Sequence, residues 1–137
     1  MEKQSLDFIK EHSVAVLSTC SDGEPHGVPV YYLFVEEQNK FYFLTKDSTR
    51  KYNNLQKNSK AFLSIYDENP QAVFTADCDV HLIDRQGNFE EILSKLVDIH
   101  GEQAHQPTPA SIQKEGSLRL VELTISKDRY VSYKLSV

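Results

Sequence analysis

Apolar and polar residues alternate along much of the chain, and this period of two is typical of β-strands that are buried on one face. Residues 14–20 are the first such run and are rich in β-branched and small apolar side chains. Residues 21–25 follow with Ser, Asp, Gly and Pro, which favour a turn. Similar runs and turns recur, and they predict strands at 14–20, 26–35, 41–45, 60–66, 71–83, 118–125 and 130–135.

Other segments space their apolar residues three or four positions apart, as one face of a helix does. They predict helices at 5–12, 48–58 and 89–103. In the second of them Tyr52 and Leu55 share a face, and Ser48 or Thr49 can cap the first turn. Residues 104–116 show neither period and contain two prolines, so we expect a loop, either a lid over a cofactor or a surface connection.

Six or seven short strands joined by tight turns favour a mainly β fold. We expect a small antiparallel β-barrel with short helices around it. The chain of 137 residues has the length of one ordinary domain, so residues 1–137 are predicted to form a single domain. Apolar residues make up 39% of it, which is enough for a core.

Composition narrows the classes of partner. The formal net charge of −5 argues against a surface that grips nucleic acid or an anionic membrane. No apolar run approaches the roughly 20 residues that span a bilayer. Cys20 and Cys78 are too few for a disulfide framework and are interpreted as reduced thiols in apolar strands. We therefore expect a cytoplasmic protein that binds neither nucleic acid nor membrane.

The charge is unevenly distributed along the chain. Residues 40–60 hold six Lys and Arg and a single acid, Asp47, which gives +5 there and leaves −10 for the rest. Within this segment, residues 45–51 (TKDSTRK) lie between a predicted strand and a predicted helix. A helix start offers unpaired N–H donors, and Arg50 and Lys51 add two cations, a combination that suits a phosphate group. A solvated basic helix face is the alternative that this pattern leaves open.

The order of these segments resembles the pyridoxamine 5'-phosphate oxidase-like family of FMN-binding split barrels. The resemblance runs from about Leu6 to Ile83 and is weaker beyond. It rests on five short motifs in a fixed order rather than on any one of them. They are residues 21–26 (SDGEPH), 29–31 (PVY), 41–45 (FYFLT), 49–51 (TRK) and 54–58 (NLQKN).

The resemblance implies a split β-barrel that binds FMN. Arg50 and Lys51 would hold the FMN phosphate, and the hydroxyls of Thr45 and Thr49 would contact phosphate or ribityl oxygens. The strand through Val28, Pro29, Val30 and Tyr31 would follow the isoalloxazine ring and satisfy its polar edge with backbone groups. The resemblance also implies a homodimer with a flavin site at the interface.

The activity implied is that of an FMN-dependent oxidoreductase, which moves a hydride or electrons between the flavin and a small substrate or electron donor. The chain has no Trp, unlike the longer vitamin B6-forming oxidases of the family, so we expect a different substrate. No acid, base or nucleophile stands out as catalytic. The alternatives are a non-catalytic protein that carries or senses flavin, deazaflavin or haem, and a family member that has lost its cofactor.

Two further groups have the residue types of a metal site. Asp77, Asp79 and His81 share one strand face, but alternating strands commonly present such a face to solvent. His100 lies near Glu102 and His105 in a spacing that matches no zinc motif. We therefore expect no metal. Six aromatic residues suit either a flavin wall or an ordinary core, namely Tyr31, Tyr32, Phe41, Phe43, Phe62 and Phe74.

Overall fold

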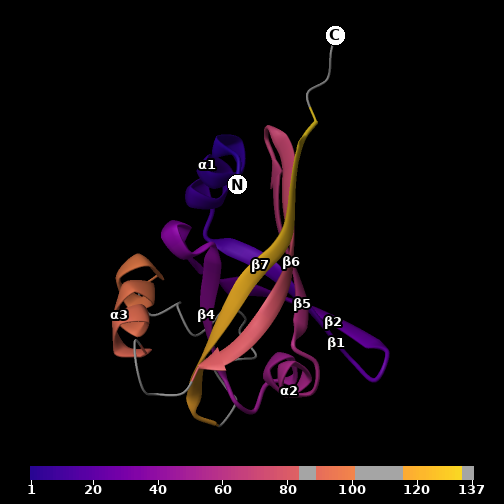
Figure 1. Ribbon diagram of the computed structural model, residues 1–137, viewed down its shortest axis with the longest axis vertical. Coiled ribbons are helices and arrows are strands. Elements are labelled where there is room, and N and C mark those ends of the chain that lie inside the picture. Colours follow the sequence, from indigo (N-terminus) through magenta and orange to yellow (C-terminus); the bar gives the residue numbers. More distant parts are fainter. Residues whose placement is uncertain (84–88, 101–115, 134–137) are drawn as a thin grey trace.

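The computed structural model describes residues 1–83, 89–100 and 116–133, and Figure 1 shows the arrangement of their elements. The elements are α1 (Lys3–Glu11), β1 (Val14–Ser21), β2 (Glu24–Tyr31), β3 (Leu33–Val35), η1 (Glu36–Gln38), β4 (Lys40–Lys46), α2 (Arg50–Lys57), β5 (Lys60–Glu68), β6 (Gln71–Ile83), α3 (Phe89–His100) and β7 (Leu118–Ser132). The predicted helices are thus confirmed as α1, α2 and α3. Residues 101–103 and 104–115 of the predicted third helix and loop lie outside the described residues.

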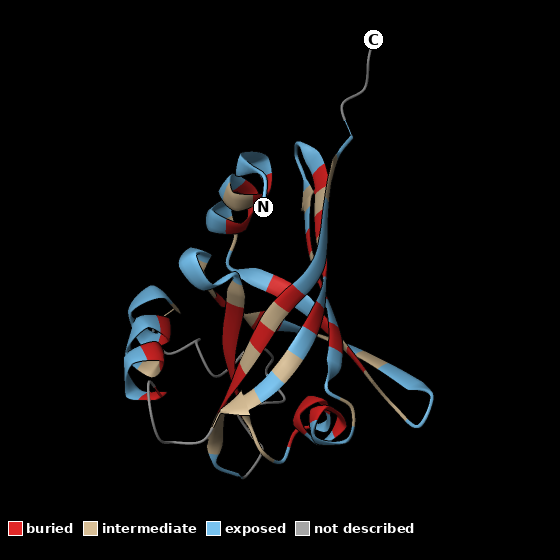
Figure 2. Ribbon diagram, viewed as in Figure 1, coloured by how far each residue is buried: buried red, intermediate tan, exposed pale blue. Residues whose placement is uncertain are grey.

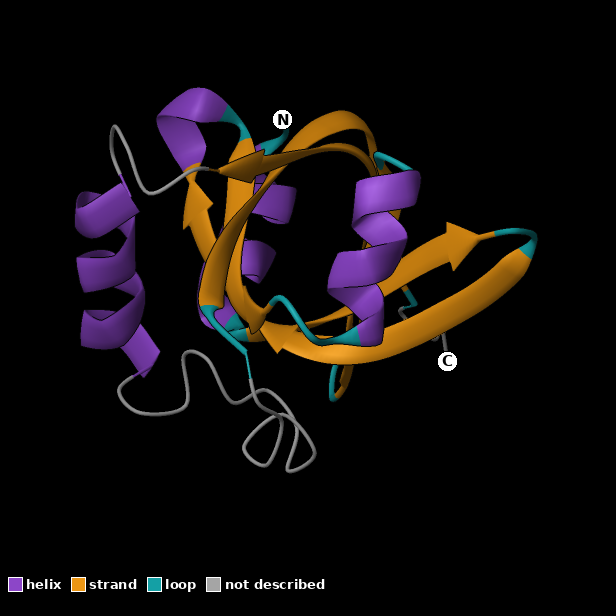
Figure 3. Cartoon of the chain, turned by 90° about the horizontal axis from the view of Figure 1, so that it is seen from below, coloured by secondary structure: helices purple, strands orange, loops and turns teal. Residues whose placement is uncertain are grey.

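The strands form one antiparallel sheet in the order β2-β1-β5-β6-β7-β4-β3, as expected for the mainly β split-barrel fold. The sheet curls so that its edge strand β2 approaches β4 across the open side, and Figure 3 shows the strands curving into a barrel. Asp22 and Gly23 both have positive φ and close the β1–β2 hairpin, the conformation that an Asp-Gly turn favours.

The main core lies inside this curl, where alternate residues of each strand point inward (Figure 2). Tyr32, Phe41, Phe43 and Phe74 are buried there, so these aromatic residues are core. Phe62, by contrast, points outward and is 41% exposed.

A second core lies between the outer face of β4 and α3. Tyr42 and Leu44 of β4 pack against Ile92 and Leu96 of α3, with Leu120 of β7 beside them. Strand β4 is therefore buried on both faces, which explains why residues 41–45 are apolar with little alternation.

The prediction of one strand at 26–35 is wrong in one respect, because the strand is interrupted at Tyr32. Residues before the break pair with β1, whereas β3 pairs with β4 at the opposite edge of the sheet. The Tyr32 hydroxyl donates to the Ile9 carbonyl oxygen at 2.6 Å, and its N–H donates to Ser13 at 3.2 Å. These bonds fix the crossing between the two edges.

The prediction of two separate strands at 118–125 and 130–135 is also wrong. Residues 118–132 form one long strand, β7, which pairs with β4 through its first half and with β6 along nearly its whole length. Its register with β6 shifts at Ser126, which has no opposite residue and donates from Oγ to the Asp77 carbonyl oxygen at 3.0 Å. The polar residues that follow from this bulge onward resemble a turn in the sequence, although they continue the strand.

Candidate functional site

The predicted phosphate-binding residues Thr45, Thr49, Arg50 and Lys51 lie together where β4 ends and α2 begins. Thr49 is the N-cap of α2, and its hydroxyl accepts a hydrogen bond from the Tyr52 N–H at 3.3 Å. The Thr49 hydroxyl also donates to the Lys46 carbonyl oxygen at 2.9 Å and lies 2.9 Å from the Thr45 hydroxyl. Both hydroxyls are buried and shape the turn, which sets the direction of the helix start.

Arg50 and Lys51 occupy different environments in the first turn of α2. The Arg50 side chain is half-exposed, and its Nη2 lies 3.8 Å from a carboxylate oxygen of Glu24 at the tip of the β1–β2 hairpin. Lys51 is only 4% exposed. A buried ammonium group is tolerated only among polar or anionic groups. The helix start thus carries one accessible and one enclosed cation, both near its positive end.

The predicted ring-binding residues Val28, Pro29, Val30 and Tyr31 lie on β2, an edge of the sheet. Val30 is fully buried in the core and Val28 packs against it, while Pro29 and Tyr31 point to the other face. An edge strand turns the backbone groups of alternate residues away from its partner, and Pro29 is suited to such a position because it has no N–H. The free edge of β2 can therefore offer hydrogen bonds to a planar ligand.

The curl of the sheet brings the predicted phosphate-binding residues near the predicted ring-binding strand. Glu24, at the start of β2, contacts Arg50, and β2 approaches β4, the strand that carries Thr45. The roles assigned to the eight residues remain predictions, but their placement in space is compatible with one elongated ligand.

One neighbouring contact was not anticipated from the sequence. The carboxylate of Asp47, in the turn before α2, accepts hydrogen bonds from Arg119 and from the Ser117 N–H at the start of β7. Because 72 residues separate Asp47 from Arg119, no local signal could have revealed this pair.

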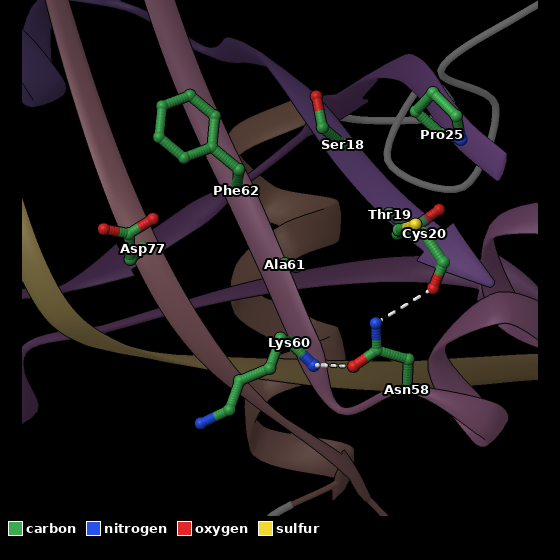
Figure 4. Close-up of a pocket in the computed structure, with 9 residues that line it drawn as sticks. All are labelled: Ser18, Thr19, Cys20, Pro25, Asn58, Lys60, Ala61, Phe62 and Asp77. Carbon is green, nitrogen blue, oxygen red and sulfur yellow. Dashed lines mark hydrogen bonds between the residues drawn. The ribbon is translucent and has the colours of Figure 1, made fainter. Parts of the chain in front are cut away.

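A hollow of about 300 Å³ opens on the outer face of the sheet, between β1, β5 and the C-terminal end of α2 (Figure 4). Asn58 donates from Nδ2 to the Cys20 carbonyl oxygen at 3.0 Å and accepts from the Lys60 N–H at 3.1 Å. Phe62 and Asp77 also line the hollow. The surface of the hollow is thus mainly apolar, and the polar groups of Asn58 within it already bond to the Cys20 and Lys60 backbone.

The other candidate groups have ordinary environments. Asp77, Asp79 and His81 are exposed and alternate with half-buried or buried residues, and Asp79 forms an ion pair with Lys60. Within residues 1–83, 89–100 and 116–133, no three His, Cys, Asp or Glu residues are grouped so that they could hold a metal ion. His100 lies 2.7 Å from the Tyr32 carbonyl oxygen, and Glu102 and His105 fall outside the described residues.

Both cysteines are free thiols. Burial, with a smaller contribution from Asp77 and Asp79, raises the pKa of the Cys78 thiol to about 12. Cys78 is therefore protonated at neutral pH and is part of the core rather than a nucleophile. None of the helices in the described part of the chain is long and apolar enough to cross a membrane.

The comparisons with known proteins agree with this architecture. Residues 1–132 match the family model described as pyridoxamine 5'-phosphate oxidase. No curated protein matches the sequence significantly.

Several solved structures share the fold at low sequence identity. The haem storage protein HutZ of Vibrio cholerae has a TM-score of 0.74 at 16% identity, over 96% of this chain and 93% of its own. A Clostridium acetobutylicum protein related to general stress protein 26, of the pyridoxinephosphate oxidase family, has a TM-score of 0.71 at 18% identity, over 95% and 87%. An FMN-binding, pyridoxamine 5'-phosphate oxidase-related protein of Nostoc punctiforme has a TM-score of 0.65 at 16% identity, over 94% and 81%.

Proposed function

Because the chain belongs to the pyridoxamine 5'-phosphate oxidase family, we propose that it binds FMN, with the phosphate at the start of α2 and the ring along β2. The observation that carries this proposal is the arrangement at residues 45–51. Thr49 caps the helix, and the next two residues are cations in its first turn. Helix dipole, backbone donors and cationic side chains all favour a dianionic phosphate at this point.

The rest of FMN would lie along the remaining parts of the proposed site. The isoalloxazine ring has a polar edge of alternating donors and acceptors, which the unpaired backbone groups of β2 would satisfy. Bound FMN would supply hydride or electron transfer. The protein's own residues would anchor the phosphate, orient the ring and exclude water from one of its faces.

The same proposal includes a homodimer. Val14 and Val16 of β1 and Phe62 and Tyr66 of β5 are exposed together on the outer face of the sheet. Pro29 of β2 lies opposite Val16 and extends this apolar face to the edge strand. A second copy would cover the face by two-fold symmetry and would bring its own residues close to the ring-binding edge.

The proposal is tested with apoprotein titrated with FMN and with riboflavin, and flavin fluorescence gives both affinities. We expect FMN to bind and Arg50→Ala to weaken FMN binding by roughly 10- to 100-fold, since a charge-assisted contact to phosphate contributes about 1.5–3 kcal/mol. Lys57→Ala removes the same charge from the exposed far end of the same helix and serves as the matched control. A wild-type protein that does not take up FMN would refute the proposal.

The same preparation decides between the flavin and haem alternatives. Titration with haemin, followed through its Soret absorbance, is run beside the FMN titration because HutZ, a haem storage protein, shares the fold. Stoichiometric haem uptake with no FMN uptake would favour the haem-binding alternative. If FMN binds, anaerobic reduction by NADH or NADPH followed by reoxidation distinguishes an oxidoreductase from a passive flavin carrier.

A further inference from the structure

Asp47 is the single acid in the basic segment 40–60, yet it lies in the turn that leads into the proposed phosphate site. A carboxylate there would repel a phosphate if its charge were free. Its charge is not free. Oδ2 lies 3.3 Å from Nη2 and 3.4 Å from Nε of Arg119, and Oδ1 accepts the Ser117 N–H at 3.1 Å.

The backbone of Asp47 is attached to the same strand. Its N–H donates to the Ser117 carbonyl oxygen at 3.0 Å, directly beyond the last paired residues of β4 and β7, Lys46 and Leu118. Asp47 therefore extends the β4–β7 ladder by one residue through its backbone. Its side chain adds two further attachments, to Ser117 and Arg119.

Gly116 leaves the space that this arrangement requires. It has a φ of +133°, and a Cβ built on it would lie 2.6 Å from Asp47 Oδ1 and 3.0 Å from Ser48 Oγ. Any larger residue would push the carboxylate or the turn aside and would also be strained in this backbone conformation. The glycine is thus matched to the position of Asp47.

The turn between Asp47 and Thr49 is held at both ends. Asp47 fixes it to β7, and Thr49 closes it through two bonds to the Lys46 carbonyl oxygen, from its N–H at 3.2 Å and from its hydroxyl at 2.9 Å. The first N–H groups of α2 and the Arg50 side chain follow directly. The attachment of Asp47 therefore helps to set their position relative to the sheet, beside the packing of α2 on the core.

We propose that Asp47 is a positioning residue for the phosphate site, acting through its bonds to Ser117 and Arg119, with Gly116 providing the space for its carboxylate. The inference rests on the proposed binding of a phosphate at the start of α2. In this role Asp47 acts on the site through Ser117 and Arg119, without a contact of its own to the phosphate. Arg119 neutralises the carboxylate, so the turn gains rigidity without losing the local positive charge of Arg50 and Lys51.

A purely electrostatic role and a positioning role of Asp47 predict opposite changes in phosphate affinity for the same substitution. If Asp47 acts only as a negative charge near the anion, Asp47→Ala tightens phosphate binding. If it positions the turn, the same substitution weakens binding by about tenfold, the loss expected when charged hydrogen bonds that hold a site are removed. Asp47→Asn keeps an oxygen for the Ser117 N–H and is expected to recover part of the loss.

The test uses inorganic phosphate, followed through the amide resonances of Thr49, Arg50 and Lys51 in ¹⁵N NMR, and then FMN and riboflavin. Asp47→Ala and Gly116→Ala are compared with wild type and with Asp7→Ala, an exposed acid on α1. Far-UV circular dichroism shows whether each variant folds. Gly116→Ala provides a second, independent perturbation of the same contact.

We expect both Asp47→Ala and Gly116→Ala to weaken phosphate and FMN binding, with riboflavin affinity and the Asp7→Ala control unchanged. Unchanged or tighter phosphate binding in Asp47→Ala would overturn the inference, as would an equal loss of riboflavin affinity. Phosphate binding that depends on Asp47, in a wild-type protein that does not bind FMN, would refute the proposed cofactor and leave the positioning role supported. A wild-type protein that binds FMN while its Thr49, Arg50 and Lys51 amides respond neither to phosphate nor to FMN would overturn the positioning role alone, and one that responds to neither ligand would refute both.

Discussion

The two cysteines show how strongly the environment of a single residue determines its chemistry. Cys78 is 2% exposed on β6, whereas Cys20 is partly exposed at the end of β1. Their local sequences are alike, since each lies in an apolar strand pattern. Only the packing of the strands distinguishes a core thiol from an accessible one.

We expect Cys78 to resist Ellman's reagent at pH 8 in the native protein, because its raised pKa leaves almost no thiolate and the sulfur is buried. The measurement uses Cys20→Ser, in which Cys78 is the remaining thiol, with Cys78→Ser as the matched control. Labelling of Cys20→Ser should appear only when denaturant unfolds the protein. Rapid native labelling of Cys20→Ser would contradict the burial of Cys78.

Asp67 connects the β5–β6 hairpin to α1. Its Oδ1 accepts the Asn69 N–H at 3.0 Å, and its Oδ2 lies 2.9 Å from His12 Nε2, while His12 Nδ1 lies 2.6 Å from the Phe8 carbonyl oxygen. The Asn69 N–H and then His12 hold the pKa of Asp67 below its ordinary value of 3.8. The ionised carboxylate is therefore favoured in the folded state.

This lowered pKa predicts a pH dependence of stability. The contribution of Asp67 is fully present above its unfolded pKa of 3.8 and is lost as the pH falls through the lower folded value. Urea unfolding of wild type and Asp67→Asn should show a difference at pH 6 that shrinks steadily below pH 4. A difference that stays constant down to pH 2 would show that the carboxylate does not titrate as described.

At the scale of elements, the stability of α2 comes from its N-terminal cap and its packing rather than from its length. It has eight residues, and isolated helices of that length are unstable in water, so its stability comes from capping and packing. Asn54 of α2 donates to the Thr19 hydroxyl of β1 at 3.0 Å, and Tyr52 and Leu55 join the core. Thr49 supplies the cap.

We therefore expect Thr49→Ala to lower the free energy of unfolding by about 1–2 kcal/mol, as the loss of a Thr cap does in other helices. Thr49→Ser keeps the hydroxyl and should restore most of it. Urea unfolding followed by circular dichroism measures both. Equal stability of Thr49→Ala and wild type would mean that the cap contributes nothing.

The sequence predicts most elements because their apolar residues recur with the period of a strand or a helix. It misses the break at Tyr32 because residues 31–34 (YYLF) are all apolar or aromatic and hide the change of partner strand. It also divides β7, because residues 126–129 (SKDR) are polar, whereas ladder hydrogen bonds use backbone groups that every residue but proline possesses. The residues of the proposed phosphate site could be grouped from the sequence because they are neighbours in it, but the Asp47–Arg119 pair needs the fold.

At the scale of the whole molecule, the outer face of the sheet holds four of the eight large apolar side chains that are exposed in the described part of the chain. Val14, Val16, Phe62 and Tyr66 lie exposed on two adjacent strands rather than scattered. The sequence alone leaves Phe62 as a core or flavin-wall residue, and it cannot show that these four positions form one exposed surface. The proposed homodimer accounts for them.

If this face is the dimer interface, Phe62→Asp should yield monomers, because a carboxylate at the centre of an apolar interface loses its hydration. Sedimentation velocity ultracentrifugation measures the change. Val97→Asp on α3 is the matched control, since Val97 is as exposed as Phe62, at 45% against 41%, and lies away from the sheet face. A monomeric wild-type protein, or a dimer that survives Phe62→Asp, would refute this interface.

The strand order also determines when each part of the sheet can form as the chain is synthesised. Strands β1, β2, β5 and β6 can pair among themselves once β6 has left the ribosome, but β3 and β4 join them only through β7. Lys46, the last residue of β4, pairs with Leu118, so the β3–β4 hairpin waits for 72 further residues. At bacterial or eukaryotic rates of synthesis this is roughly 4–15 s. Strand β4 lacks its partner strand β7 throughout that interval, which makes this hairpin a segment of the nascent chain where chaperones are expected to bind.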